Sequence, residues 1–220
     1  MSLRKFVNKT IPYLEPYDTC KKAVEIMTAF KVSHLAVAAS QDKMYIGLIS
    51  EDDIEDFSPK MPVMETDCLQ RLSVSEDKHI LEVLDIVSST KVSLLPVVDA
   101  KGKYTGALTY KNIIERMAEE TSASIKGGII EIETETKNFS PALIAGISEN
   151  NSLKVMSLLT RPKDLETMRA VIKLNGQDTS SVVQGLEKHG YNVKNVYQGD
   201  SKYSDLLQER YNALLSYMNV

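Results

Sequence analysis

The fold is decided by a stretch that occurs twice, as KVSHLAV at residues 31–37 and as KVSLLPV at residues 91–97. The matches continue on both sides of this stretch at an offset of about 60 residues. The flanking blocks are AVEIM at 23–27 with VLDIV at 83–87, and GLISEDD at 47–53 with GALTYKN at 106–112. Three blocks that recur in one order indicate an internal repeat, which fixes the architecture before single residues are considered.

Each copy begins with the pattern of a helix followed by a buried strand. In the first copy, Thr19 is a capping-type residue ahead of apolar residues at helical spacing, and Ser75 to Asp77 hold the corresponding place in the second. The apolar runs at 35–38 and 94–98 are long enough only for short strands. A polar turn and a second strand follow in both copies.

A second helix is expected to begin at Ser50 in the first copy and at Thr109 in the second. Each unit therefore has the order helix, strand, strand, helix. Because about 60 residues bury too little surface to be stable alone, we expect the two copies to pack on each other as one domain.

Two motifs carry a resemblance to a known family. The second copy contains LPVVDAKG at residues 95–102, and both copies have a glycine, then Ser or Thr, then Asp or Asn at three-residue steps. This pattern resembles the CBS domain, which occurs as tandem pairs. The resemblance implies one repeat at residues 8–60 and a second at residues 61–120; the first is the more divergent, because Ala36 replaces the proline.

The glycine-to-helix element of each copy is suited to an anion on physical grounds. A strand that ends in a glycine-permitted turn and opens a helix directs backbone N–H groups and the positive end of the helix dipole at one place. The hydroxyl of Ser50 or Thr109 can donate to a phosphate, and the Asp53 carboxylate can accept from the two hydroxyls of a ribose. Helix capping requires the same residue types without any ligand, so the spacing leaves both interpretations open.

The resemblance to CBS pairs implies that these positions bind an adenine nucleotide, with backbone around a Val-Ser-x tripeptide at the edge of the base. The residues that match are Val32, Ser33, His34, Ser50 and Asp53 in one half, and Val92, Ser93, Leu94, Thr109 and Asn112 in the other. Asn112 lacks the charge of an aspartate, so we expect its half to be weak or empty. The expected ligands are AMP, ADP, ATP or S-adenosylmethionine, as regulatory ligands and not as a required cofactor.

Composition and motifs exclude several other functions. The formal charge of -4 argues against non-specific nucleic-acid binding, and no apolar run of about 18 residues predicts a membrane span. The N-terminus does not resemble a secretory signal, so a cytoplasmic location is expected. Cys20 and Cys68 lack metal-site spacing, and the acids at 51–56 suit a helix start better than a metal site. No known catalytic motif is present, so no catalytic residue is expected.

The remaining chain has a different order after an expected linker at residues 121–128. We expect strands at 130–136, 153–159, 168–174 and 191–197, with helices that begin at Ser140 and Asp178. This βαββαβ order predicts a four-stranded antiparallel, ferredoxin-like sheet at residues 129–198 with helices on one face, and an α+β class for the whole chain.

That order after a CBS pair resembles the ACT domain, a regulatory module that often binds amino acids, and the combination resembles CBS–ACT regulatory proteins of the acetoin-utilisation type. The loop at 137–141 has no glycine to let a ligand approach the backbone, which disfavours amino-acid binding. Edge pairing of such sheets favours a homodimer instead. An apolar stripe predicts a helix at 203–220, packed on its own domain or on a sister subunit.

The sequence therefore leads to one hypothesis and one alternative. The hypothesis is a cytoplasmic, non-catalytic regulatory protein that binds an adenine nucleotide, forms a homodimer and acts on an unidentified protein target. The alternative is a ligand-free structural or protein-interaction module that dimerises through its CBS and ACT-like domains.

Overall fold

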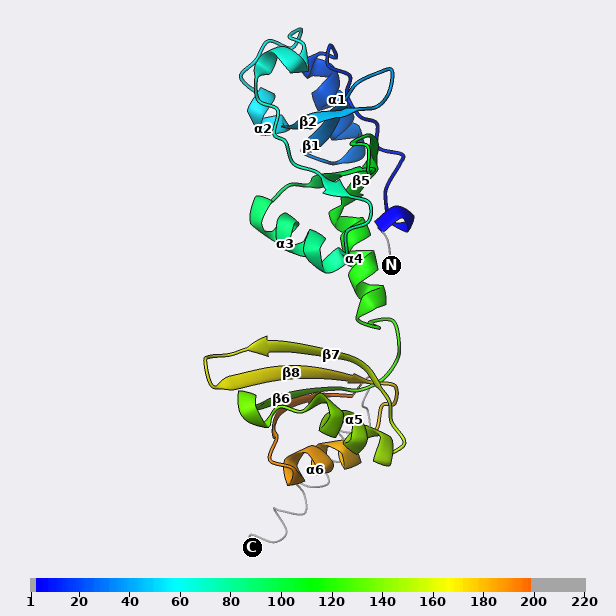
Figure 1. The fold of residues 1–220 in the computed structure, drawn as a ribbon, viewed down its shortest axis with the longest axis vertical. Coiled ribbons are helices and arrows are strands. Elements are labelled where there is room, and N and C mark those ends of the chain that lie inside the picture. Colours follow the sequence, from blue (N-terminus) through cyan, green and yellow to red (C-terminus); the bar gives the residue numbers. More distant parts are fainter. Residues whose placement is uncertain (1–2, 199–220) are drawn as a thin grey trace, which may run out of the picture. The chain divides into compact units, whose positions relative to one another are not determined.

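The computed structural model describes residues 3–198 in two compact units that divide between Met117 and Ala118 (Figure 1). Each unit has its own hydrophobic core. Both units combine helices with a sheet, so the expected α+β class is confirmed. The helix predicted at 203–220 lies outside the described residues.

The first unit contains both copies of the repeat. The first copy supplies α1 (Cys20–Phe30), β1 (His34–Ala38), β2 (Tyr45–Ser50) and α2 (Glu51–Ile54). The second supplies β3 (Val74–Ser75), α3 (Ile80–Thr90), β4 (Leu94–Val98), β5 (Tyr104–Thr109) and α4 (Tyr110–Glu120). The order helix, strand, strand, helix is present in both copies, and the short strand β3 precedes it in the second.

The two copies begin their first helices with different caps. The Thr19 hydroxyl accepts a hydrogen bond from the Lys22 N–H at the start of α1, as the sequence predicts. In the second copy, the cap expected among Ser75 to Asp77 is wrong, because His79 caps α3. His79 Nδ1 accepts from the Leu81 N–H, and the Glu82 carboxylate returns to the His79 N–H.

The chain segment that precedes each copy pairs first with the β-hairpin of the other copy, and this exchange joins the two copies. Asn8 pairs with Ala107 on β5, and Gln70 pairs with Leu48 on β2, so each leading segment first crosses to the hairpin of the other copy. Further along, each segment pairs in parallel with its own copy, at Leu14 with Val37 and at Val74 with Val97. The two copies consequently share one hydrophobic core, which confirms that they pack as one domain.

The motif glycines serve this exchange. We expected them in turns, but Gly47 lies inside β2 and Gly106 inside β5. A Cβ on Gly106 would come within 2.7 Å of the Asn8 carbonyl oxygen, and one on Gly47 within 2.9 Å of the Leu69 Cβ. Gly106 also has a φ of 145°, which side-chain-bearing residues rarely adopt. These glycines therefore let the crossing segments approach the sheet.

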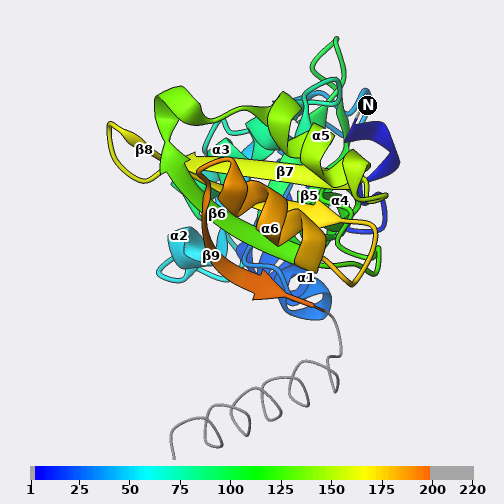
Figure 2. The ribbon, with the colours of Figure 1, turned by 90° about the horizontal axis from the view of Figure 1, so that it is seen from below.

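The second unit is a helix-covered sheet. Its elements are β6 (Ile129–Glu135), α5 (Pro141–Asn150), β7 (Val155–Pro162), β8 (Thr167–Leu174), α6 (Ser180–Lys188) and β9 (Asn192–Tyr197). The strand order is β7-β8-β6-β9, and all pairs are antiparallel. Figure 2 shows α5 and α6 side by side over this sheet. The topology is ferredoxin-like, as the βαββαβ order predicts.

Candidate functional site

The Ser50–Asp53 turn joins β2 to the first turn of α2. Ser50 is buried, and its Oγ accepts a hydrogen bond from the Asp53 N–H at 3.0 Å. Asp53 is partly exposed, and its carboxylate accepts one long hydrogen bond, at 3.4 Å, from Nε2 of Gln70. A carboxylate can accept several hydrogen bonds, so Asp53 retains the capacity that a diol would use.

The corresponding turn of the second copy is closed on itself. The Thr109 hydroxyl donates to Asn112 Oδ1 at 2.8 Å, and the Thr109 N–H reaches the same oxygen at 3.1 Å. The Asn112 N–H donates back to Thr109 Oγ1 at 3.4 Å. The amide oxygen of Asn112 is therefore occupied by helix capping, whereas Asp53 is not used in that way.

The two copies meet at their Val-Ser-x tripeptides. The Ser33 N–H donates to Ser93 Oγ at 2.9 Å, and Nδ1 of His34 lies 3.2 Å from the same oxygen. The Glu51 N–H donates to the Ser33 carbonyl at 2.9 Å, which ties the start of α2 to this contact. The structure thus brings together Ser33, His34, Ser93 and the Ser50–Asp53 turn.

The other predicted residues enter this region through their backbones only. Val32, Val92 and Leu94 have buried side chains that belong to the shared core. A role for these three residues at the edge of a base is therefore limited to backbone N–H and carbonyl groups.

His34 is half-buried between the two copies. Burial lowers its pKa below the usual value, and the nearby charges of Asp53 and Asp52 oppose that shift. The lowered pKa favours the neutral ring. Its Nδ1 lies within 3.4 Å of the Ser93 N–H, which matches a neutral ring that accepts hydrogen bonds.

Gln70 is a residue that sequence reasoning missed at this site. It belongs to the segment leading into the second copy, yet it contacts Asp53 of the first. Its backbone pairs with Leu48 on β2, three residues before α2 begins at Glu51, and this pairing holds Gln70 beside the turn. The only signal in the sequence is its position: Gln70 precedes the second copy as Asn8 precedes the first.

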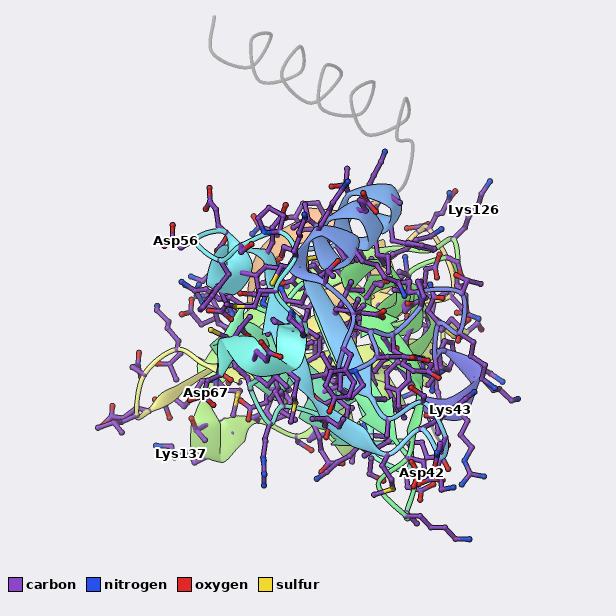
Figure 3. The ribbon with its side chains drawn as sticks, turned by 90° about the horizontal axis from the view of Figure 1, so that it is seen from above. Asp42, Lys43, Asp56, Asp67, Lys126 and Lys137 are labelled. Atoms are coloured by element: carbon purple, nitrogen blue, oxygen red, sulfur yellow. The ribbon has the colours of Figure 1, made fainter. Side chains whose placement is uncertain are left out.

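A cavity of about 450 Å³ lies next to the candidate site, between α1 and α2. It is lined by Cys20, Val24, Glu51, Asp52, Ile54 and Phe57, among others, and its lining does not include Ser33, Ser50 or Asp53. Figure 3 labels Asp56, an exposed residue just after α2 that points outward. The cavity is therefore separate from the residues that are predicted to bind the nucleotide, although α2 borders both.

Residues 3–198 contain no group of three His, Cys, Asp or Glu side chains that could hold a metal ion. Cys20 and Cys68 are free thiols, and burial raises the pKa of Cys20. Across the same residues, no helix has the length and apolar character needed to cross a bilayer.

Comparison with known proteins agrees with the repeat structure. Residues 3–60 and 62–119 each match the model of the CBS domain. Inosine-5'-monophosphate dehydrogenase from Methanocaldococcus jannaschii is 30% identical over 126 residues, which are 56% of this chain and 25% of that enzyme. The enzyme from Aquifex aeolicus is 30% identical over 107 residues, 47% of this chain and 22% of its own. The chain thus spans about a quarter of the length of these curated relatives.

Solved structures are similar over the same extent. A CBS domain pair/ACT domain protein from Thermotoga maritima has a TM-score of 0.50 and 22% identity, covering 54% of this chain and 98% of its own. CBSX2, solved in complex with AMP, has a TM-score of 0.46 and 22% identity, covering 54% of this chain and 96% of its own. With two adjacent matches to the family model and two copies that share one core, the chain belongs to the CBS-domain family as a tandem pair.

Proposed function

We propose that the CBS pair binds an adenine nucleotide beside Ser33 and Asp53 and acts as a regulatory unit without catalysis. The observation that carries the proposal is the hydrogen bond from the Glu51 N–H to the Ser33 carbonyl at 2.9 Å. It holds the backbone that would meet a base next to the turn that would meet a ribose. Asp53, at the first turn of α2, supplies two carboxylate oxygens for the ribose hydroxyls.

The charge of this turn favours some adenine nucleotides over others. Glu51, Asp52 and Asp53 are consecutive acids in the first turn of α2. Each added phosphate would bring further negative charge close to these carboxylates, and like charges repel. We therefore expect AMP or the cationic S-adenosylmethionine to bind more tightly than ADP or ATP.

The regulatory part of the proposal follows from the chain's organisation. The curated relatives are enzymes about four times as long as the matched region, and this chain instead joins the CBS pair to a ferredoxin-like unit. We propose that this unit is an ACT-like dimerisation domain in a homodimer. A nucleotide that prefers one arrangement of the two units would shift their equilibrium toward that arrangement, and an unidentified target protein would respond to the shift.

The test is calorimetric titration of the full chain with AMP, ADP, ATP and S-adenosylmethionine. Asp53→Asn removes the charge but keeps the shape, and we expect it to weaken binding roughly tenfold or more, because hydrogen bonds to charged groups are the stronger ones. Asp56→Asn is the matched control, since Asp56 is an exposed acid three residues along that makes no part of the site. Its affinity should equal that of the wild type.

A thermal melt gives an independent readout. A nucleotide at 100 times its dissociation constant stabilises the folded state by about 2.7 kcal/mol. If none of the four ligands shifts the melt or gives a titration signal, the chain is the alternative, a ligand-free module that dimerises. If Asp53→Asn and the wild type bind the nucleotide with equal affinity, Asp53 is not part of the binding site, and the nucleotide binds elsewhere on the chain.

A further inference from the structure

The ferredoxin-like unit carries a cavity of about 370 Å³ on the sheet face opposite its helices. Alternate residues of β8, such as Ala170 and Ile172, are buried toward the helices, so Arg169 and Val171 lie on the open face. The cavity is lined by three cations from three strands, Arg161 on β7, Arg169 on β8 and Lys194 on β9. Its volume falls in the range of small-molecule sites.

Two of these cations stand directly opposite each other. Arg161 and Arg169 are partners in the antiparallel register of β7 and β8. Like charges in this position destabilise a sheet unless something between them neutralises the charge. Arg169 has a carboxylate on its other side, because Glu133 is its partner on β6 and lies 3.5 Å from its Nε. Within residues 3–198, Arg161 makes no ion pair, and its side chain borders the cavity.

The carboxylates nearby do not balance the cations. Glu133 is buried and serves three of them at once, Lys163, Arg169 and Lys194. Glu131 lines the cavity and accepts a hydrogen bond from Asn195 Nδ2 at 2.8 Å. Among the residues that line the cavity itself, three cations (Arg161, Arg169 and Lys194) face one carboxylate, Glu131, so the lining has an excess of two positive charges.

We propose that this cavity binds a small dianionic oxyanion, a phosphate monoester or a dicarboxylate, between Arg161 and Arg169 with Lys194 as the third donor. The planar guanidinium forks suit bidentate contact with carboxylate or phosphate oxygens. Two unmatched positive charges favour a dianion over a monoanion. Val171 on the cavity wall gives apolar contact for the carbon skeleton of the ligand. This site is independent of the proposed nucleotide site, since it uses none of the same residues.

The test uses the full chain and simple probes at constant ionic strength. Inorganic phosphate and succinate are titrated separately, with acetate and chloride as monoanionic references, and backbone amide shifts in an NMR spectrum report where each probe binds. We expect saturable shifts at residues of β7, β8 and β9 with phosphate or succinate, at concentrations where acetate and chloride give none. If phosphate alone saturates, the site takes phosphate esters; if succinate alone saturates, it takes dicarboxylates.

Arg161→Gln is the decisive variant, because Arg161 is exposed on an edge strand and its loss leaves the core intact. We expect it to weaken dianion binding roughly tenfold or more. Lys137→Gln is the control, an exposed cation of the same unit that lies outside the cavity lining and is labelled in Figure 3. Its dianion affinity should match the wild type.

Thermal melts separate a binding site from mere charge repulsion. Without a dianion, Arg161→Gln should melt at the same temperature as the wild type or higher, because opposed like charges are removed. With phosphate or succinate, the wild type should gain stability and the variant should not. The proposal is overturned by non-saturable shifts, by equal binding in Arg161→Gln, or by a response that depends on protein concentration and so marks a contact between copies.

Discussion

The backbone N–H of Ser33 donates to the hydroxyl of Ser93 at 2.9 Å, across the boundary between the two copies of the repeat. The two serines are equivalent positions of those copies, 60 residues apart. Their contact is asymmetric, because the Ser93 N–H lies 3.4 Å from Nδ1 of His34 while the position equivalent to His34 is Leu94. One histidine thus distinguishes the two halves at the point where they meet.

Ser93→Ala should destabilise the CBS pair by about 1–2 kcal/mol, because it leaves the partly buried Ser33 N–H without its acceptor. The measurement is denaturant unfolding of the full chain. Ser89→Ala serves as the control, since the Ser89 hydroxyl is exposed and donates only within its own helix, to the Ile86 carbonyl. An effect of Ser93→Ala no larger than the control would mean that the contact adds nothing to stability.

Gly106→Ala should destabilise the CBS pair by about 2 kcal/mol or more, because the methyl group would meet Asn8 and Val7 at a backbone φ that alanine rarely adopts. Gly146→Ala is the matched substitution in α5, where a Cβ meets nothing within 4 Å. There we expect a gain of roughly 0.5–1 kcal/mol from helix propensity. Thermal unfolding of both variants checks the pair, and equal effects would contradict the close approach of the crossing segment.

The sequence was sufficient for those features of the fold that depend on local pattern. Helical spacing ahead of a short apolar run predicted α1 and β1, and the same order one repeat later predicted α3 and β4. The βαββαβ order predicted that the second sheet has four antiparallel strands and a ferredoxin-like topology, because connection rules allow few alternatives. These features need only the period and order of apolar residues.

The sequence was not sufficient for contacts between distant segments. Nothing in the local pattern of Asn8 or Gln70 indicates that each crosses to the other copy. The local pattern therefore places Gly47 and Gly106 in turns, and not at the crossing. The contact of Gln70 with Asp53 was missed for the same reason. His79 was missed as a cap because histidine is an uncommon cap residue, and only the capping box with Glu82 reveals it.

The candidate site was predictable in part. The spacing of Ser50 and Asp53 placed a hydroxyl and a carboxylate at one helix start, and the structure has them there. The closed state of the second half follows from Asn112 acting as a cap for Thr109, which a sequence motif cannot separate from ligand binding. Side-chain direction, which decides between the two, depends on tertiary contacts.

Asn112→Asp should create a second nucleotide site, because it restores the carboxylate that the second copy lacks. Asp retains the acceptor for the Thr109 N–H and adds charge and a second oxygen for a ribose. Calorimetric titration should show the stoichiometry rise from one to two nucleotides per chain for the ligand that the wild type binds best. An unchanged stoichiometry would show that the second half is closed by its geometry and not by the missing charge.

The CBS pair should lose stability as the pH falls from 7.5 to 5, and His34 should account for part of this loss. Its folded-state pKa lies below the unfolded value of 6.5, so the unfolded chain takes up the proton first as the pH falls. The contribution of His34 is thus fully present above about pH 6.5 and is lost as the pH falls toward the folded pKa. Denaturant midpoints between pH 7.5 and 5 should therefore decline less in His34→Gln than in the wild type.

The same substitution at the exposed His189, in the other unit, is the control for the pH series. It should leave the pH dependence of the CBS pair unchanged. If His34→Gln and His189→Gln follow the wild-type curve equally, His34 does not titrate with folding.

Glu133→Gln should destabilise the ferredoxin-like unit at neutral pH, because one buried carboxylate holds the side chains of Lys163, Arg169 and Lys194 together. These cations hold the pKa of Glu133 below its usual value, with Lys163 the largest cause. A lowered folded-state pKa contributes stability that is present above about pH 4.5 and is lost as the pH falls through the folded pKa. The wild type and Glu133→Gln should therefore differ at pH 7 and converge in acid.

Glu135→Gln, two residues along the same strand face, separates this effect from general loss of charge. The side chains of Glu135 and its ion-pair partner Lys137 are both exposed to solvent, so this ion pair stabilises little. Circular dichroism melts from pH 3 to pH 7 should show an acid-dependent loss of stability in the wild type and in Glu135→Gln, and a flatter profile in Glu133→Gln. Parallel profiles for all three would mean that the three cations are held by strand packing, with Glu133 contributing no net attraction.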